Sequence, residues 1–232
     1  MWLHTKESQE KITPEIALRY LNEGNQKFLN NLKINRNLLQ HSNQTSKDQF
    51  PFATILSCID SRISAELIFD QGLGDIFSIR FAGNIINEDI LGSMEYACKI
   101  ANSKLIVVLG HTKCGAIVSA CNDFEMGHLT NLLNKVRPAI EEEKKTLLER
   151  NGYNFSFVNN VSANNIKLTI QQIRSRSELL YDLETRKKIN IVGALYDIEK
   201  GVVKFYEDIS NLIGIMYPVL KAGFNHTVLK NN

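Results

Sequence analysis

The sequence lacks several features that would place it in a specialised class of protein. Its 27 basic and 25 acidic residues are interspersed and leave a formal net charge of +2, so we expect no nucleic-acid partner. No apolar run approaches the roughly 20 residues that span a bilayer, so we expect no membrane association. The N-terminus has no basic segment followed by an apolar one, as a secretory signal would. These absences predict a cytoplasmic protein with a small-molecule partner, or a periplasmic one if a leader has been removed.

Disulfides are not needed to stabilise a chain of this size. The 232 residues are 44% apolar and contain no low-complexity tract, which predicts a single domain spanning 1–232. The four cysteines are Cys58, Cys98, Cys114 and Cys121. In the absence of an export signal we expect free thiols in a reducing compartment, where they could serve a metal or catalysis.

The chain begins with a predicted helical arm, residues 1–48, ahead of a core at 49–232. Thr13, Pro14 and Glu15 have the order of an N-cap, a first helical residue and an early acid. The apolar spacing after them predicts a helix to Leu32, and the polar residues that follow up to position 48 are predicted to form a loop.

In the core, short apolar runs alternate with amphipathic helical patterns. Predicted strands occupy 51–58, 75–83, 104–110, 190–197 and 202–208, the last two as a hairpin. Predicted helices occupy 64–70, 87–102, 115–124, 129–150 and 159–186. This alternation is typical of an α/β fold in which a mostly parallel central sheet is covered by helices on both faces.

Two loops that follow predicted strands carry the reactive side chains. They are CIDSR, residues 58–62, and HTKCG, residues 111–115. Each motif alone is weak evidence, because a buried cysteine beside a surface ion pair is common. Ligands of open α/β sheets bind beyond the carboxyl ends of the strands, so both loops lie where a site is expected. Cys58, His111 and Cys114 therefore predict a zinc site with three protein ligands and an open fourth position.

The motifs C-x-D-x-R and G-H-x-x-C-G resemble the signature of the β-class carbonic anhydrases. Further stretches similar to that family are GNQKF (24–28), FDQGLGDIFSIRFAGN (69–84), GSMEYA (92–97) and GALYDIEKGVVKF (193–205). Within that family, two positions favour the plant-type subgroup: Gln49 is present, and Ile55 stands where a bacterial subgroup has tryptophan. The resemblance implies four mostly parallel strands with a further edge strand. It also implies reversible hydration of CO2 to bicarbonate and a proton, by attack of zinc-bound hydroxide on CO2 in an apolar pocket.

The resemblance also assigns roles to individual residues. It implies one Zn2+ per subunit on Cys58, His111 and Cys114, with Asp60 and Arg62 as a hydrogen-bonded catalytic pair beside it. The implied substrate-binding residues are Gln49 as a hydrogen-bond donor, Phe77, Ala82 and Tyr96 as the lining of the CO2 pocket, and Gly115 through its backbone N–H. The family further implies a homodimer or a higher even oligomer such as a tetramer, in which the glutamine and the pocket aromatics reach the neighbouring subunit's site.

Two other functions are compatible with the same motifs. The first is hydrolysis of carbon disulfide or carbonyl sulfide, which are isoelectronic with CO2, at the same zinc site. The second is a zinc protein without catalysis. A structural zinc site would have four protein ligands and little use for Asp60, Arg62 and Gln49, so CO2 hydration is favoured.

Overall fold

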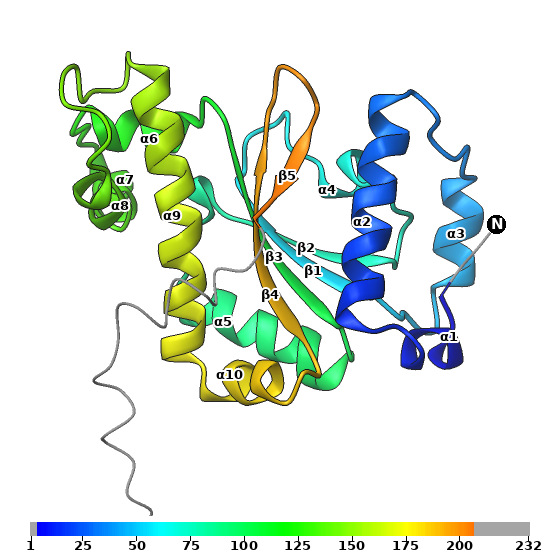
Figure 1. Ribbon diagram of the computed structural model, residues 1–232. Coiled ribbons are helices and arrows are strands. Elements are labelled where there is room, and N and C mark those ends of the chain that lie inside the picture. Colours follow the sequence, from blue (N-terminus) through cyan, green and yellow to red (C-terminus); the bar gives the residue numbers. More distant parts are fainter. Residues whose placement is uncertain (1–3, 207–232) are drawn as a thin grey trace, which may run out of the picture.

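A five-stranded sheet in the order β2-β1-β3-β4-β5 forms the centre of the fold (Figure 1). The computed structural model describes residues 4–206, so the ends of the predicted domain and the last two residues of the predicted strand 202–208 lie outside the described residues. The strands are β1 (Ala53–Ser57), β2 (Ile76–Arg80), β3 (Leu105–His111), β4 (Asn190–Tyr196) and β5 (Val203–Phe205). The first four are parallel, and β5 runs antiparallel to β4. The predicted mostly parallel sheet with an edge strand is confirmed.

Helices cover both faces of the sheet. The helices are α1 (Lys6–Glu10), α2 (Pro14–Leu29), α3 (Leu38–Gln44), α4 (Ala65–Ile68), α5 (Glu88–Glu95), α6 (Gly115–Cys121), α7 (Gly127–Asn134), α8 (Arg137–Glu142), α9 (Phe155–Arg176) and α10 (Glu178–Thr185). Figure 1 shows α2 and α4 on one side of the strands and α5, α9 and α10 on the other. All residues of β1 and β3 are buried, which explains their continuous apolar sequences.

Alternate residues of the central strands face two different helical layers. Ile55 and Val107 belong to a cluster that includes Leu21 of α2. Leu56 and Val108 belong to the opposite cluster, with residues of α5, α9 and α10. The strands are therefore fixed in register from both sides, because a shift by one residue would turn each side chain to the other face.

Three parts of the predicted secondary structure are wrong. The predicted loop 35–48 contains α3, which begins where Asn37 accepts a hydrogen bond from the Gln40 amide. The predicted helix 129–150 is two short helices, α7 and α8. Helix α8 ends at Glu142. The carboxylate of the next residue, Glu143, is buried and accepts hydrogen bonds from amides and side chains of the following loop. The predicted helix 159–186 is divided at Ser177, whose extended backbone and hydroxyl cap α10.

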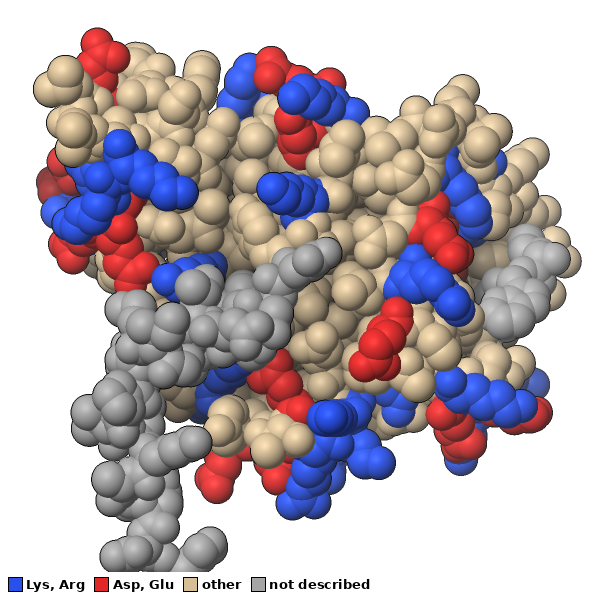
Figure 2. All heavy atoms as spheres, viewed as in Figure 1, with Lys and Arg blue, Asp and Glu red and all other residues tan. Residues whose placement is uncertain are grey.

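The described residues show no membrane-spanning element and no concentration of one charge on the visible face. Within residues 4–206, no helix has both the length and the apolar content required to cross a bilayer. On the face drawn in Figure 2, basic and acidic side chains are interspersed over the part of the chain that is described.

Gly24 lets α2 approach the turn that follows α4. A Cβ at this position would lie 1.7 Å from the carbonyl oxygen of Phe69. We expect Gly24→Ala to lower the free energy of unfolding by about 1 to 3 kcal/mol, the usual cost of overpacking. Glu23, the exposed residue before Gly24 in α2, is the matched control. Glu23→Ala should change the free energy of unfolding by no more than about 0.5 kcal/mol, as is usual for an exposed position. Urea unfolding at one protein concentration measures both, and an equal loss in the two variants would contradict the packing argument.

Candidate metal centre

The carboxyl ends of β1 and β3 bring three metal-ligating side chains together. Cys58 directly follows β1, and His111 is the last residue of β3. Cys114 caps α6 three residues later. The ligating atoms of these three residues lie within 4.8 Å of one another, and all three residues are buried. The register aligns Ser57 with Leu109, so both ligand-bearing segments leave the sheet at the same edge.

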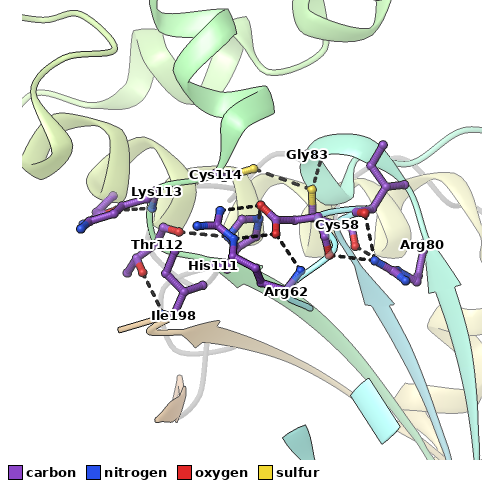
Figure 3. Close-up of polar contacts among 12 residues, drawn as sticks. Cys58, Arg62, Arg80, Gly83, His111, Thr112, Lys113, Cys114 and Ile198 are labelled. Atoms are coloured by element: carbon purple, nitrogen blue, oxygen red, sulfur yellow. Dashed lines mark hydrogen bonds and ion pairs between the residues drawn. The ribbon is translucent and has the colours of Figure 1, made fainter. Parts of the chain in front are cut away.

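The ring of His111 is oriented for coordination through Nε2. Its Nδ1 lies 3.0 Å from the carbonyl oxygen of Thr112 (Figure 3). Because a carbonyl can only accept, Nδ1 carries the hydrogen and Nε2 keeps its lone pair. That Nε2 is buried and has no hydrogen-bond partner within residues 4–206. Donation of the second ring nitrogen to a carbonyl is the usual arrangement of a metal-binding histidine.

The two thiols share one proton. Their sulfur atoms are 3.8 Å apart. The hydrogen bond with Cys114 lowers the pKa of Cys58 to about 4, although burial opposes it, and the Gly83 amide acts in the same direction as Cys114. The same hydrogen bond, followed by burial, raises the pKa of Cys114. One thiolate is thus preformed, and a cation placed between the sulfurs would replace the shared proton.

These donors fit Zn2+. Two sulfurs and one imidazole nitrogen match the preference of zinc for thiolate and imidazole, and the orphaned Nε2 supplies a lone pair with nothing else to bind. Cys58, His111 and Cys114 would hold the ion. Three protein ligands leave a fourth position open, as in catalytic zinc sites.

Asp60 and Arg62 form a two-pronged ion pair beside the three ligands. Arg62 Nε donates to Asp60 Oδ1 at 2.9 Å and Nη2 donates to Oδ2 at 2.7 Å. The side chain of Asp60 is only 14% exposed, and its Oδ2 lies 4.0 Å from His111 Nε2. The hydrogen bonds from Arg62 lower the pKa of Asp60 to about 2, although partial burial opposes them. The carboxylate is therefore ionised and close to the metal ligands.

Ala82 and Gly115 lie next to the ligands. Ala82 begins the turn η1 (Ala82–Asn84), in which the Gly83 amide lies 3.4 Å from the Cys58 sulfur and donates to it. Gly115 is the first residue of α6 and is exposed, and a Cβ there would meet no atom within 4 Å. Both residues are thus direct chain neighbours of groups in the centre, Ala82 of Gly83 and Gly115 of Cys114.

The other three predicted substrate-binding residues lie away from this centre in the single chain. Gln49 is exposed and precedes β1, at the end opposite Cys58. Phe77 is near the amino end of β2, and its ring lies 6.4 Å from that of Tyr96, measured between centroids. Tyr96 is 54% exposed, and both rings line an open surface hollow of about 700 Å³.

Sequence reasoning missed two residues that support the ligand-bearing loops. Arg80, at the end of β2, donates to backbone carbonyls of the CIDSR loop. Asn159 of α9 accepts from the amide of Lys113, whose φ of 54° makes the turn between His111 and Cys114. The one available signal was that Arg80 is a charged residue in the carboxyl-terminal half of the predicted strand 75–83.

Comparisons with known proteins agree on one family. A sequence profile of the family described as carbonic anhydrase matches residues 53–203. Carbonic anhydrase 2 of Mycobacterium tuberculosis is 34% identical over 205 residues, which cover 86% of this chain and 96% of that protein. The structure of the β-carbonic anhydrase CcaA has a TM-score of 0.65 at 26% identity, over 82% of this chain and 87% of that chain. A tetrameric β-carbonic anhydrase of the ascomycete Sordaria macrospora has a TM-score of 0.62 at 20% identity, over 73% of this chain and 90% of that chain.

Proposed function

The chain belongs to the β-class carbonic anhydrases, and from this membership we propose that it catalyses the zinc-dependent, reversible hydration of CO2 to bicarbonate and a proton. The observation that carries the proposal is the convergence of Cys58, His111 and Cys114 with an ionised carboxylate beside them. A structural zinc site would not require that carboxylate. Its presence next to an incomplete ligand set supports catalysis.

The residues of this chain have separate tasks in the proposed reaction. Zinc, when bound, lowers the pKa of a coordinated water and so supplies hydroxide at neutral pH. Asp60 accepts a hydrogen bond from the reacting water and so orients its lone pair towards CO2. Arg62 holds Asp60 in place and keeps it ionised. The Gly115 amide, next along the chain to the ligand Cys114, donates to the bicarbonate oxygen.

We propose that the apolar part of the CO2 pocket is completed between two copies of the chain. The Phe77 and Tyr96 rings are packed against each other, with Tyr96 exposed and Phe77 half-buried, which suits a surface that a second copy covers. Gln49 is exposed as well, as a donor to a neighbouring site would be. A homodimer, or a tetramer of two such dimers, would bring these side chains to the partner's metal centre, and the Sordaria macrospora relative is tetrameric.

Zinc content and stopped-flow CO2 hydration by the purified protein test the proposal together. We expect about one zinc per chain and hydration well above the rate of buffer. Stoichiometric zinc without hydration, even at alkaline pH, would overturn the proposal. Release of sulfide from carbon disulfide or carbonyl sulfide would then identify the alternative substrate at the same site. No turnover of any of the three would indicate a non-catalytic zinc protein.

The hydration rate should rise from mildly acidic to alkaline pH. Two thiolate ligands would offset the double positive charge of zinc, so zinc would be a weaker Lewis acid here than with three neutral ligands. It would lower the pKa of a coordinated water by less, and hydroxide would become available at higher pH. Asp60 does not cause the rise. Its pKa is lowered to about 2, so the carboxylate is ionised over this whole range and becomes protonated only as the pH falls towards 2. Stopped-flow rates across this range measure the effect, and a flat profile would contradict it.

A further inference from the structure

The CIDSR loop is held by a side chain of the neighbouring strand after the strand ladder has ended. Ser57 is the last residue of β1 and is paired in register with Arg80, the last residue of β2. The Phe81 amide donates to the Ser57 carbonyl at 2.9 Å, the final backbone bond between these two strands. Beyond this point the chain leaves the sheet towards the metal centre.

The guanidinium of Arg80 donates to three successive carbonyls of this departing segment. Nε donates to the Cys58 oxygen at 3.3 Å. Nη2 donates to the Ile59 oxygen at 2.9 Å and to the Asp60 oxygen at 2.8 Å (Figure 3). A planar fork with fixed donor directions can satisfy several carbonyls at once, and a lysine ammonium cannot reproduce that geometry.

These contacts involve the two functional residues of the segment through their backbone. Cys58 carries one of the two sulfurs of the ligand cluster, and Asp60 carries the carboxylate that lies near His111. Fixing the carbonyls from 58 to 60 restricts the backbone rotations that set the direction of both side chains. Arg80 is itself exposed, so it does not serve the apolar core. Its contacts are with the loop backbone, whereas the Asp60 carboxylate is bound by Arg62.

We propose that Arg80 is a positioning residue for the metal centre. Its guanidinium fork fixes the angle at which the Cys58 sulfur and the Asp60 carboxylate face the ion. The kinetic consequence rests on the proposed function, whereas the geometric consequence can be measured without turnover. Loss of an outer contact of this kind commonly costs about 10- to 100-fold in activity or metal affinity.

The test compares wild type, Arg80→Gln and Arg80→Lys, each loaded with zinc for kinetics and with Co2+ for absorption spectra. For Arg80→Gln we expect kcat to fall about 10- to 100-fold, with little change in KM, because the contacts of Arg80 are with the loop backbone. We also expect shifted cobalt absorption bands, because the angle of the thiolate ligand changes. Arg80→Lys should show a smaller effect of the same kind. Arg186→Gln is the control for the loss of an exposed arginine and should match wild type, because Arg186 follows α10 and its guanidinium pairs with Asp182 at 2.8 Å.

Three outcomes would overturn the proposal. The first is wild-type kcat and wild-type cobalt spectra in both Arg80 variants. The second is a slow Arg80→Gln with an Arg80→Lys equal to wild type, because that result would assign the effect to charge alone. The third concerns an Arg80→Gln protein that circular dichroism shows to be unfolded. In that case Arg80→Lys decides, and a wild-type cobalt absorption spectrum in that variant would overturn the proposal. If the wild-type protein itself does not hydrate CO2, the proposed function fails while the cobalt spectra still test Arg80.

Discussion

Cys114→Ala is expected to remove stoichiometric zinc binding and to abolish CO2 hydration. The substitution deletes one of only two sulfur ligands and leaves the buried Cys58 and His111 as an incomplete pair. Since loss of an outer-shell partner already costs about 10- to 100-fold in metal affinity, loss of a ligand should cost more than that. Zinc content after dialysis against a weak chelator and stopped-flow hydration measure the two effects.

Cys121→Ala is the matched control for this prediction. Cys121 lies in the same helix and the same apolar cluster as Cys114, and it is also buried. Its sulfur is not part of the cluster of ligating atoms formed by Cys58, His111 and Cys114, and burial raises its pKa to about 11. Each variant replaces one buried thiol by a hydrogen atom in similar surroundings. Cys121→Ala should keep zinc and activity, and a Cys114→Ala protein that retained full zinc would remove the assigned ligand set.

Asp60→Asn is expected to keep zinc and to lose about 100-fold or more of the hydration rate. An amide of the same shape has no negative charge and cannot accept both hydrogen bonds from Arg62. The orientation of the reacting water is then lost, and removal of a positioned acid or base group typically costs about 10²- to 10⁴-fold. Zinc analysis and stopped-flow hydration of the same sample separate binding from catalysis.

Asp123→Asn distinguishes this effect from that of an ordinary surface ion pair. Asp123 pairs with Arg137 at 3.2 Å, and both side chains are more than half exposed. Such pairs contribute little, so Asp123→Asn should have wild-type rate and stability. If Asp60→Asn behaved in the same way, the Asp60 and Arg62 pair would have no catalytic role.

The sequence predicts the sheet and the metal ligands well for a physical reason. The strands are buried on both faces, so their apolar runs stand out from the helical patterns between them. Zinc chemistry limits the ligands to a few residue types, and the ends of β1 and β3 supply them. Both signals are local, and each can be recognised within about ten residues of chain.

The errors occurred where single side-chain contacts, and not the apolar pattern, decide the local structure. The end of α8 depends on the buried Glu143 carboxylate and its ion pair with Arg150, which no periodicity reveals. Arg80 donates to backbone carbonyls, which every residue has, so the sequence does not show which ones it contacts. Phe77 and Tyr96 lie away from the metal centre in the single chain, and in the proposed dimer a second copy would complete their pocket.

The parallel pairing of β1 and β3 has a consequence for the order of folding. The chain between Cys58 and His111 includes β2 and α5, so the two ligands meet only after a long loop has closed and the strands have paired. Non-local pairing of this kind is slow compared with helix formation. Zinc would therefore bind late, after the sheet has formed. It would stabilise the native state but would not start folding.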